Sequence, residues 1–326
     1  MQRSRLALRT CKRALSTTAQ PAQSASYQPP VQPGTLPAYD HALAYIQQDR
    51  DHKLAQLEEL KKRQADQAQL DKLEIEAWSN DPETRWRAKN GHADFSKPVY
   101  RHLAERAWRK DGDLAILMQR VTQMHVTPDL LPEIKPAADV RLAVGGSTIE
   151  PGVFTKPADT REAFDVSVQV YHSEERLYTL LVIDPDVPDE FNQTFTTFAH
   201  LLIPNVPLSA TSSSPLALSS LPSTLSYVPP HPQKGTPYHR YTVLLLEQPS
   251  QLNLSAEQAP AREGFSVRDF VKEHGLACRG VSFFRQVWDK DVSGIYTDVL
   301  NRPEPRYGRP PKMDMYAGRP PKYEVV

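Results

Sequence analysis

The sequence predicts a mainly β protein, with an antiparallel β domain over residues 127–292, a helical extension before it and an extended tail after it. Apolar residues at every second position from Val140 onward, followed by two longer apolar runs, predict the strands. Residues 38–81 contain neither Gly nor Pro and are rich in strong helix formers. Residues 293–326 end in proline-rich repeats with too few aliphatic side chains to build a core. The sequence thus indicates one folded domain with long flanks.

Residues 1–22 have the composition of a mitochondrial presequence. Arg and Leu residues are interleaved there, Ser and Thr follow them, and no Asp or Glu occurs before Asp40. The alternative is an unstructured basic tail without a targeting role. Residues 23–37 are rich in Pro, Gln and Ser, a composition typical of a linker. We therefore expect a protein of the mitochondrial matrix.

Charge, cysteine content and hydropathy indicate which class of protein and which compartment the chain suits. The chain has 39 basic and 39 acidic residues, so its net charge of zero hides local clusters. Cys11 lies in the expected presequence, which leaves Cys278 as the one cysteine of the mature chain and suits a reducing compartment. No apolar run approaches the roughly 18–20 residues that a membrane-spanning helix needs.

The helical extension over residues 38–126 is expected to begin with one long helix, residues 38–81. Its apolar positions recur at spacings of three and four, but the stripe is interrupted, so it does not form a continuous coiled-coil seam. Such a helix either packs along a large partner or lies solvated against its own domain. A short helix over residues 113–123 is expected to lead into the domain.

Aromatic and basic residues are interleaved over residues 78–113. This segment contains three of the four tryptophans of the chain. Basic side chains can neutralise phosphates and aromatic rings can stack on bases, so this segment is a candidate RNA-contacting or partner-contacting surface. The alternative is an ordinary pair of helices with a local Trp core and solvated arginines. The candidate contact residues are Arg85, Arg87, Arg101, Arg106, Arg109 and Lys110.

Two further segments of the domain have clear local signals. Residues 207–226 are rich in Ser, Leu and Pro, which predicts a flexible insertion. A helix is expected over residues 267–274, because Ser266 and Asp269 resemble a capping box and Gly275 can end the helix.

Three polar strings border the apolar runs of the domain. DPDVP follows one run at residues 184–188, His200 opens the next, and HRY at residues 239–241 opens the last. Because sites are often built at strand ends, these strings form a candidate binding site. The strings resemble the signature of the phosphatidylethanolamine-binding protein family, and the resemblance covers roughly residues 127–292. It implies that family's antiparallel β-sandwich with peripheral helices.

The resemblance also implies a small anion-binding pocket lined by Asp184, Asp186, His200, His239 and Tyr241. This chain departs from the family pattern, since Phe198 stands where the family often has Trp and Pro237 replaces a glycine of the loop. Proline fixes φ and removes a backbone donor, which alters the frame of the pocket. The alternative is that these side chains form a structural hydrogen-bonded network in which Arg240 pairs with a carboxylate.

The C-terminal tail repeats the unit GRPPK at residues 308–312 and 318–322. Cations on a stiff, extended backbone can follow phosphates or a partner groove at a modest cost in entropy. Recognition of the prolines by a protein module is the alternative. The candidate contact residues of the tail are Arg309, Lys312, Arg319 and Lys322.

Taken with its flanks, the chain resembles family members that belong to the mitochondrial large ribosomal subunit. The resemblance implies a structural role, with ribosomal RNA and neighbouring ribosomal proteins as partners, and no enzymatic activity. The sequence contains no nucleophile motif, metal-ligand spacing or phosphate loop, so we expect no catalytic residue, metal or cofactor. A free-standing mitochondrial binder of anions or phospholipid head groups is the alternative.

Overall fold

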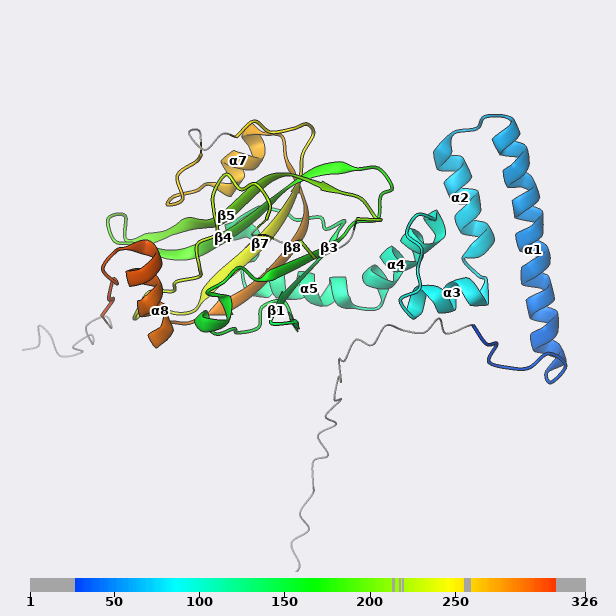
Figure 1. Ribbon diagram of the computed structural model, residues 1–326, viewed down its shortest axis with the longest axis horizontal. Helices are drawn as coiled ribbons and strands as arrows, with labels where there is room; N and C mark the ends of the chain where they lie inside the picture. Colours follow the sequence, from blue (N-terminus) through cyan, green and yellow to red (C-terminus); the bar gives the residue numbers. More distant parts are fainter. Residues whose placement is uncertain (1–26, 213–214, 217, 219, 255–258, 309–326) are drawn as a thin grey trace, which may run out of the picture.

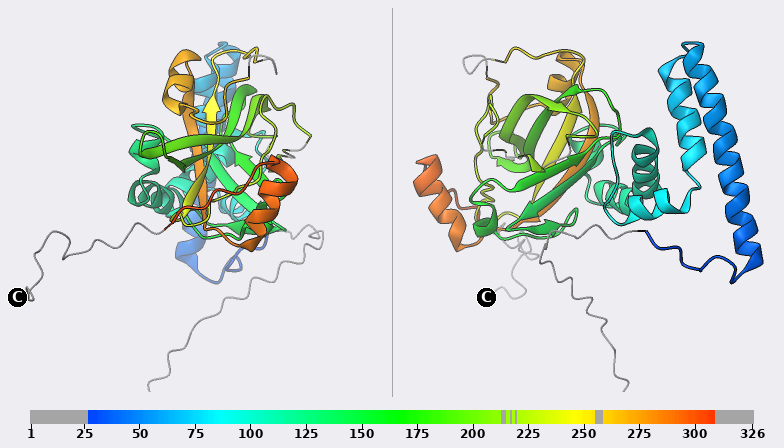
Figure 2. Two further views of the ribbon diagram at one scale, coloured as in Figure 1. Left: turned by 90° about the vertical axis from the view of Figure 1, so that its left-hand side faces the viewer. Right: turned by 45° about the vertical axis from the view of Figure 1, so that its right-hand side comes forward.

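The computed structural model describes residues 27–212, 215–216, 218, 220–254 and 259–308. It consists of a β domain with a helical extension at one end and a short helical segment at the opposite end (Figures 1 and 2). The predicted mainly β fold with N-terminal helices is confirmed. The predicted presequence and both GRPPK units fall wholly or almost wholly outside the described residues.

Six helices make up the extension and its connection to the domain. They are α1 (Pro37–Lys62), α2 (Gln67–Trp78), α3 (Pro82–Lys89), α4 (Pro98–Lys110), α5 (Asp113–Gln123) and α6 (Val126–Asp129). The helix predicted over residues 113–123 is therefore confirmed as α5. In Figure 1, α1 and α2 lie side by side as a hairpin that projects away from the β domain.

The prediction of one long helix over residues 38–81 is wrong. The chain reverses between α1 and α2, where Gln64 adopts a left-handed conformation with φ of 54°. No Gly or Pro occurs at this turn, so the local sequence does not predict it. The hairpin buries Leu57 and brings Arg50 over the ring of Trp78, with 5.1 Å from the guanidinium carbon to the ring centroid. A straight helix would leave these contacts unmade, which explains why tertiary packing overrides helix propensity here.

Two antiparallel sheets form the β-sandwich. The first has the strand order β2-β1-β3-β6 and the second has the order β5-β4-β7-β8. The strands of the first sheet are β1 (Asp139–Val144), β2 (Ser147–Ile149), β3 (Asp165–Gln169) and β6 (Pro215–Leu216). Those of the second sheet are β4 (Arg176–Asp189), β5 (Thr194–Leu208), β7 (His239–Glu247) and β8 (Ala277–Gln286).

The second sheet is buried on both faces. Along β4, Leu180 and Val182 belong to the core shared with the first sheet, whereas Leu181 and Ile183 belong to a second core that includes α5 and α7 (Val267–Glu273). Burial on both faces explains why β4 and β7 read as continuous apolar runs and not as alternating ones. It also places the polar residues at their ends next to a dry interior.

The extension is attached to the domain through aromatic and polar contacts. Trp108 of α4 is buried and packs on Tyr171, with ring centroids 5.8 Å apart. Arg120 of α5 donates to the carbonyl of Pro151 over 2.6 Å, and Leu117 of the same helix enters the second core. The Trp108 ring is therefore packed inside the protein, as the alternative of a local tryptophan core predicted, and is not exposed for stacking on bases.

The described part of the 207–226 insertion is attached to the domain. Its strand β6 pairs with β3, and the side chains of Ala210, Leu218 and Leu225 are buried. The helix α7 begins as predicted, because the Ser266 hydroxyl accepts a hydrogen bond from the backbone N–H of Asp269. Gly275 follows the end of this helix with φ of 61°, in the left-handed region that favours glycine.

The chain leaves the domain through α8 (Lys290–Ile295) and the π-helical turn η3 (Tyr296–Leu300). Residues 301–308 then run back across the 233–237 loop, where the Tyr307 N–H donates to the Lys234 carbonyl over 2.8 Å. We call residues 296–307 the C-terminal strap. Across the described ranges of the chain, no helix has the length and apolar character needed to cross a membrane.

Candidate functional site

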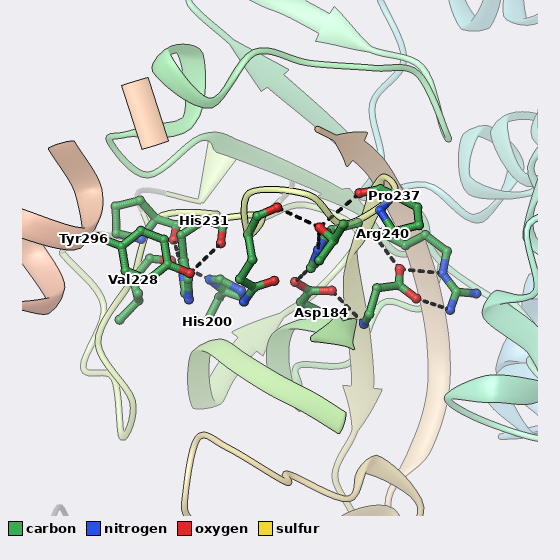
Figure 3. Close-up of polar contacts among 12 residues, drawn as sticks. Asp184, His200, Val228, His231, Pro237, Arg240 and Tyr296 are labelled. Atoms are coloured by element: carbon green, nitrogen blue, oxygen red, sulfur yellow. Dashed lines mark hydrogen bonds and ion pairs between the residues drawn. The ribbon is translucent and has the colours of Figure 1, made fainter. Parts of the chain in front are cut away.

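The three polar strings meet at one end of the second sheet. β4 pairs with both β5 and β7, so Asp184 lies opposite Phe198 on one side, while Ile183 lies opposite Thr242 on the other. The end of β4 therefore meets the start of β7 and the first half of β5. Figure 3 shows the polar contacts of these strings, with Asp184 and Arg240 on one side and His200, His231 and Tyr296 on the other.

At the centre of the site, Asp184 and His239 form a buried pair. His239 Nδ1 donates to Asp184 Oδ2 over 2.7 Å, and the other oxygen of Asp184 accepts the backbone N–H of Asp186 over 2.9 Å. Thr236 Oγ1 lies 2.8 Å from the Gln233 carbonyl and 2.9 Å from His239 Nε2. If the hydroxyl proton goes to the carbonyl, the hydroxyl oxygen must accept from Nε2, so both ring nitrogens carry protons.

The electrostatics of the pair agree with an imidazolium–carboxylate contact. Burial would raise the pKa of Asp184, but the attraction and hydrogen bond of His239 outweigh burial and leave it below its usual value. Burial would likewise lower the pKa of His239, and Asp184 reverses this effect and raises it. The pair is thus an internal salt bridge that connects β4 to β7.

Asp186, the second aspartate of the motif, is held by Arg240. The backbone N–H and Nε of Arg240 both donate to Asp186 Oδ2 over 2.8 Å, and NH2 donates to Oδ1 over 2.6 Å. Arg240 NH1 donates to the Met124 carbonyl and to Asp129 Oδ2. Asp186 therefore belongs to a structural network, as the alternative to a ligand pocket anticipated. The network connects the motif to the segment between α5 and α6.

His200 and Tyr241 lie deeper and carry polar atoms without partners. His200 Nδ1 donates to the Val228 carbonyl over 2.8 Å, which leaves Nε2 as an acceptor in the neutral ring. Among the described residues, His200 Nε2 and the Tyr241 hydroxyl find no hydrogen-bond partner. Burial raises the pKa of Tyr241, as does the nearby Asp184 carboxylate. Buried polar atoms of this kind are normally satisfied by water or by a ligand.

Three residues that sequence reasoning missed complete the site. The His231 ring centroid lies 5.1 Å from that of His200 and 5.5 Å from that of Tyr296, and Gln233 and Tyr296 line the same cavity as His231. His231 and Gln233 belong to the loop just before the HRY string. Their closeness in sequence to that string could have identified them as site residues. Tyr296 comes from the C-terminal strap and had no such signal.

A cleft of about 910 Å³ lies between this cluster and the C-terminal strap. Its lining includes Phe198, His231, Gln233 and Tyr296, but none of the five residues predicted for the ligand pocket. The strap is attached to the walls of the cleft at its C-terminal end and near its middle. Tyr307 pairs with the 233–237 loop, and Arg302 forms a 2.6 Å ion pair with Glu263. The predicted pocket residues thus lie behind the cleft.

His200 should make the stability of the protein sensitive to acid. Burial lowers the pKa of His200 to about 3, below its usual value, so the folded state keeps the ring neutral while the unfolded chain protonates it near pH 6.5. Stability is full above pH 6.5 and falls as the pH drops toward 3. Linkage predicts that His200 alone contributes a loss on the order of 1–2 kcal/mol between pH 7 and pH 5.

Urea unfolding at a series of pH values checks this prediction. The His200→Asn variant should lose that part of the acid sensitivity, whereas His102→Asn, at an exposed site on α4, should keep the wild-type profile. Parallel pH profiles for wild type and His200→Asn would show that the ring is not kept neutral by the fold.

Neither a metal-binding cluster nor an activated thiol is found among the described residues. No group of three or more His, Cys, Asp or Glu side chains within the described ranges is arranged to hold a metal ion. Burial raises the pKa of Cys278 to about 12, so its thiol is far from an activated nucleophile.

The basic residues predicted to contact RNA or partners divide into three groups. Arg85, Arg87, Arg106, Arg109 and Lys110 are exposed on α3 and α4. Arg101 is buried and donates to the carbonyls of Phe95 and Ser96, so its predicted surface role is wrong. Its guanidinium contacts the loop before α4 and also pairs with Asp71 of α2 over 3.5 Å. The tail residues Arg309, Lys312, Arg319 and Lys322 fall outside the described residues.

The sequence of this chain is similar to a family model and to two known proteins. Residues 142–284 match the family model described as phosphatidylethanolamine-binding protein. The chain is 26% identical over 264 residues to the "Large ribosomal subunit protein mL38" of Schizosaccharomyces pombe, with 79% of this chain and 85% of that protein covered. It is 28% identical over 142 residues to the "Protein MOTHER of FT and TFL1 homolog 2" of Oryza sativa subsp. japonica, with 43% and 76% covered.

Among solved structures, a phosphatidylethanolamine-binding protein from Plasmodium vivax is 17% identical, with a TM-score of 0.41 over 53% of this chain and 97% of that one. The family model spans the strands that carry Asp184, His200, His239 and Tyr241. The part of the chain that carries the candidate site is therefore similar to the phosphatidylethanolamine-binding protein family.

Proposed function

We propose that this protein is a structural component of the large subunit of the mitochondrial ribosome. The observation that carries the proposal is the reach of the similarity to the large ribosomal subunit protein of S. pombe. That similarity spans 264 residues, whereas the family domain occupies residues 142–284 only, so it extends well into the flanks. The presequence-like composition of residues 1–22 supports a location in the mitochondrial matrix.

In this proposal the family domain is a module on the surface of the subunit, and the flanks hold it to ribosomal RNA and neighbouring proteins. The extension projects beyond the domain, as an anchoring arm must (Figure 2). On α4, Arg106 and Lys110 lie one turn apart, are exposed, and form no ion pair with any described residue. Their charge is therefore free to neutralise phosphates. The role needs no catalysis, and the buried site then serves to hold the domain together.

Charge reversal on α4 tests the anchoring role. The double variant Arg106→Glu, Lys110→Glu should reduce the fraction of the chain retained on large subunits at moderate salt by on the order of tenfold, because two phosphate contacts become repulsive. Retention is measured by sedimentation of mitochondrial lysates over a salt series. The control is Lys156→Glu, Lys272→Glu, at exposed sites of the domain. Equal retention of both double variants would remove α4 from the proposed RNA contact.

A second candidate function is that of a free-standing binder of anions or phospholipid head groups. The observation that favours it is the set of buried polar atoms without partners among the described residues, on His200, Gln233 and Tyr241. This candidate leaves the extension and the strap without a purpose. It predicts a chain that sediments alone and binds phosphate compounds, with binding lost in the His200→Asn variant.

A further inference from the structure

A groove of about 320 Å³ lies on the outer side of His239, away from the cleft under the strap. Two exposed aromatic side chains line it. Phe195 of β5 is 60% exposed and Tyr238, just before β7, is 40% exposed. Exposed apolar side chains that gather in one groove are typical of interaction sites.

The lining of this groove includes two carboxylates and one guanidinium, together with the rings of His125 and His239. Asp129, Asp186 and Arg240 all contribute to it. Arg240 is fully engaged by the two aspartates and the Met124 carbonyl. Asp129 accepts this one side-chain contact through Oδ2, its other oxygen has no hydrogen bond from any described residue, and its side chain is 44% exposed. The lining of the groove thus combines a carboxylate that has spare acceptor capacity with two exposed rings.

Of the nearby cations, Arg240 is shared between Asp129 and Asp186. The positive charge of His239 is matched by Asp184. Arg268 donates to the carbonyls of Pro128, Asp129 and Leu130, and it is not among the residues that line the groove. A cation entering between the rings would therefore meet the free oxygen of Asp129.

The rim beyond Tyr238 has the composition of a protein interface. Phe154 packs edge-to-face on Tyr238 with ring centroids 5.9 Å apart, and it is 50% exposed. The guanidinium of Arg285 stacks 4.1 Å from the Phe154 centroid and 5.0 Å from that of Tyr238. Val287 adds a further exposed apolar side chain. Aromatic residues and arginine are the types enriched at protein interfaces.

We propose that this groove is a docking site for a neighbouring protein, which inserts a lysine or arginine side chain between Phe195 and Tyr238 to reach Asp129. The inference rests on the proposed ribosomal function and adds a protein partner on a face separate from the basic face of α4. Aromatic walls attract a cation, and the carboxylate completes the site. RNA fits poorly, because its phosphates would approach two carboxylates.

The test uses the full chain with 3-fluorotyrosine at position 238 and follows the fluorine resonance by NMR. The probe is the blocked peptide acetyl-Ala-Arg-Ala-amide, and the comparison ligands are acetyl-Ala-Glu-Ala-amide and a four-nucleotide RNA. The arginine peptide should shift the resonance saturably, and the other two should not. Phe195→Ala should weaken binding by about three- to fivefold, the worth of an exposed cation–π contact.

Matched variants separate the groove from its surroundings. Phe191→Ala, at a 94% exposed site in the adjoining β4–β5 turn, should bind the arginine peptide as the wild type does. Asp129→Asn should weaken binding at least as much as Phe195→Ala. Equal shifts with the glutamate peptide or the RNA, no shift at all, or unchanged affinity in Phe195→Ala would each overturn the proposal. Since this assay contains no ribosome, its failure is distinguishable from failure of the ribosomal role, which sedimentation decides.

Discussion

Replacing Arg240 with methionine is expected to lower the free energy of unfolding by about 3–5 kcal/mol, the usual cost of removing one partner from a buried ion pair. Arg240 is buried and connects three segments: Asp186 at the end of β4, Asp129 in α6 and the Met124 carbonyl after α5. Methionine fills much of the same volume but satisfies none of these acceptors. Asp186 would then be left half-buried without its cation.

Urea unfolding of wild type and variant at pH 7 measures this loss. Arg161→Met is the matched control, because Arg161 forms an ion pair with Asp298 in which both side chains are about half exposed. Exposed pairs contribute roughly 0–1 kcal/mol, so this control should be nearly neutral. A loss below about 1 kcal/mol for Arg240→Met would mean that the Asp186 network does not hold the motif in place.

Trp108→Ala is expected to release the helical extension from the domain. Truncation of a buried tryptophan costs about 3–5 kcal/mol. Here the ring is the aromatic link between α4 and Tyr171, so the loss should fall mainly on the attachment of the extension. The core between the two sheets contains no residue of the extension, so the β-sandwich should remain folded.

Hydrogen exchange resolved by peptide measures this separation. Amides of α4 and α5 should exchange much faster in Trp108→Ala, whereas those of β4 and β7 should keep their protection. Trp86→Ala is the control, since Trp86 contacts Tyr27 and His92 inside the extension and lies away from the domain contact. Equal loss of protection in β4 and α4 would show that extension and domain unfold as one unit.

Much of the fold could be predicted from the sequence, because its signals were local. Period-two runs predicted β1 and β3 of the first sheet, continuous apolar runs predicted β4 and β7, and Ser266 with Gly275 bounded α7. The turn between α1 and α2 could not be predicted. It depends on Gln64 in a left-handed conformation, which becomes favourable once Leu57 and Arg50 find partners across the hairpin.

The sequence predicted those residues of the candidate site that lie on the central strands β4 and β7. Asp184 and His239 were predicted and do meet, since adjoining antiparallel strands bring them together. Tyr296 joins the site through long-range packing of the strap, for which no sequence spacing gives a clue. Composition also could not separate Arg101, which is buried against carbonyls, from the exposed Arg106 one helical turn and a residue later.

Sedimentation of a mitochondrial lysate through sucrose gradients at moderate and high salt, with a probe for this chain, tests the central claim most directly. The proposed function predicts stable co-sedimentation with the large ribosomal subunit at both salt concentrations. Recovery of the chain only at the top of the gradient at both salts would contradict a ribosomal role and favour a free-standing ligand binder.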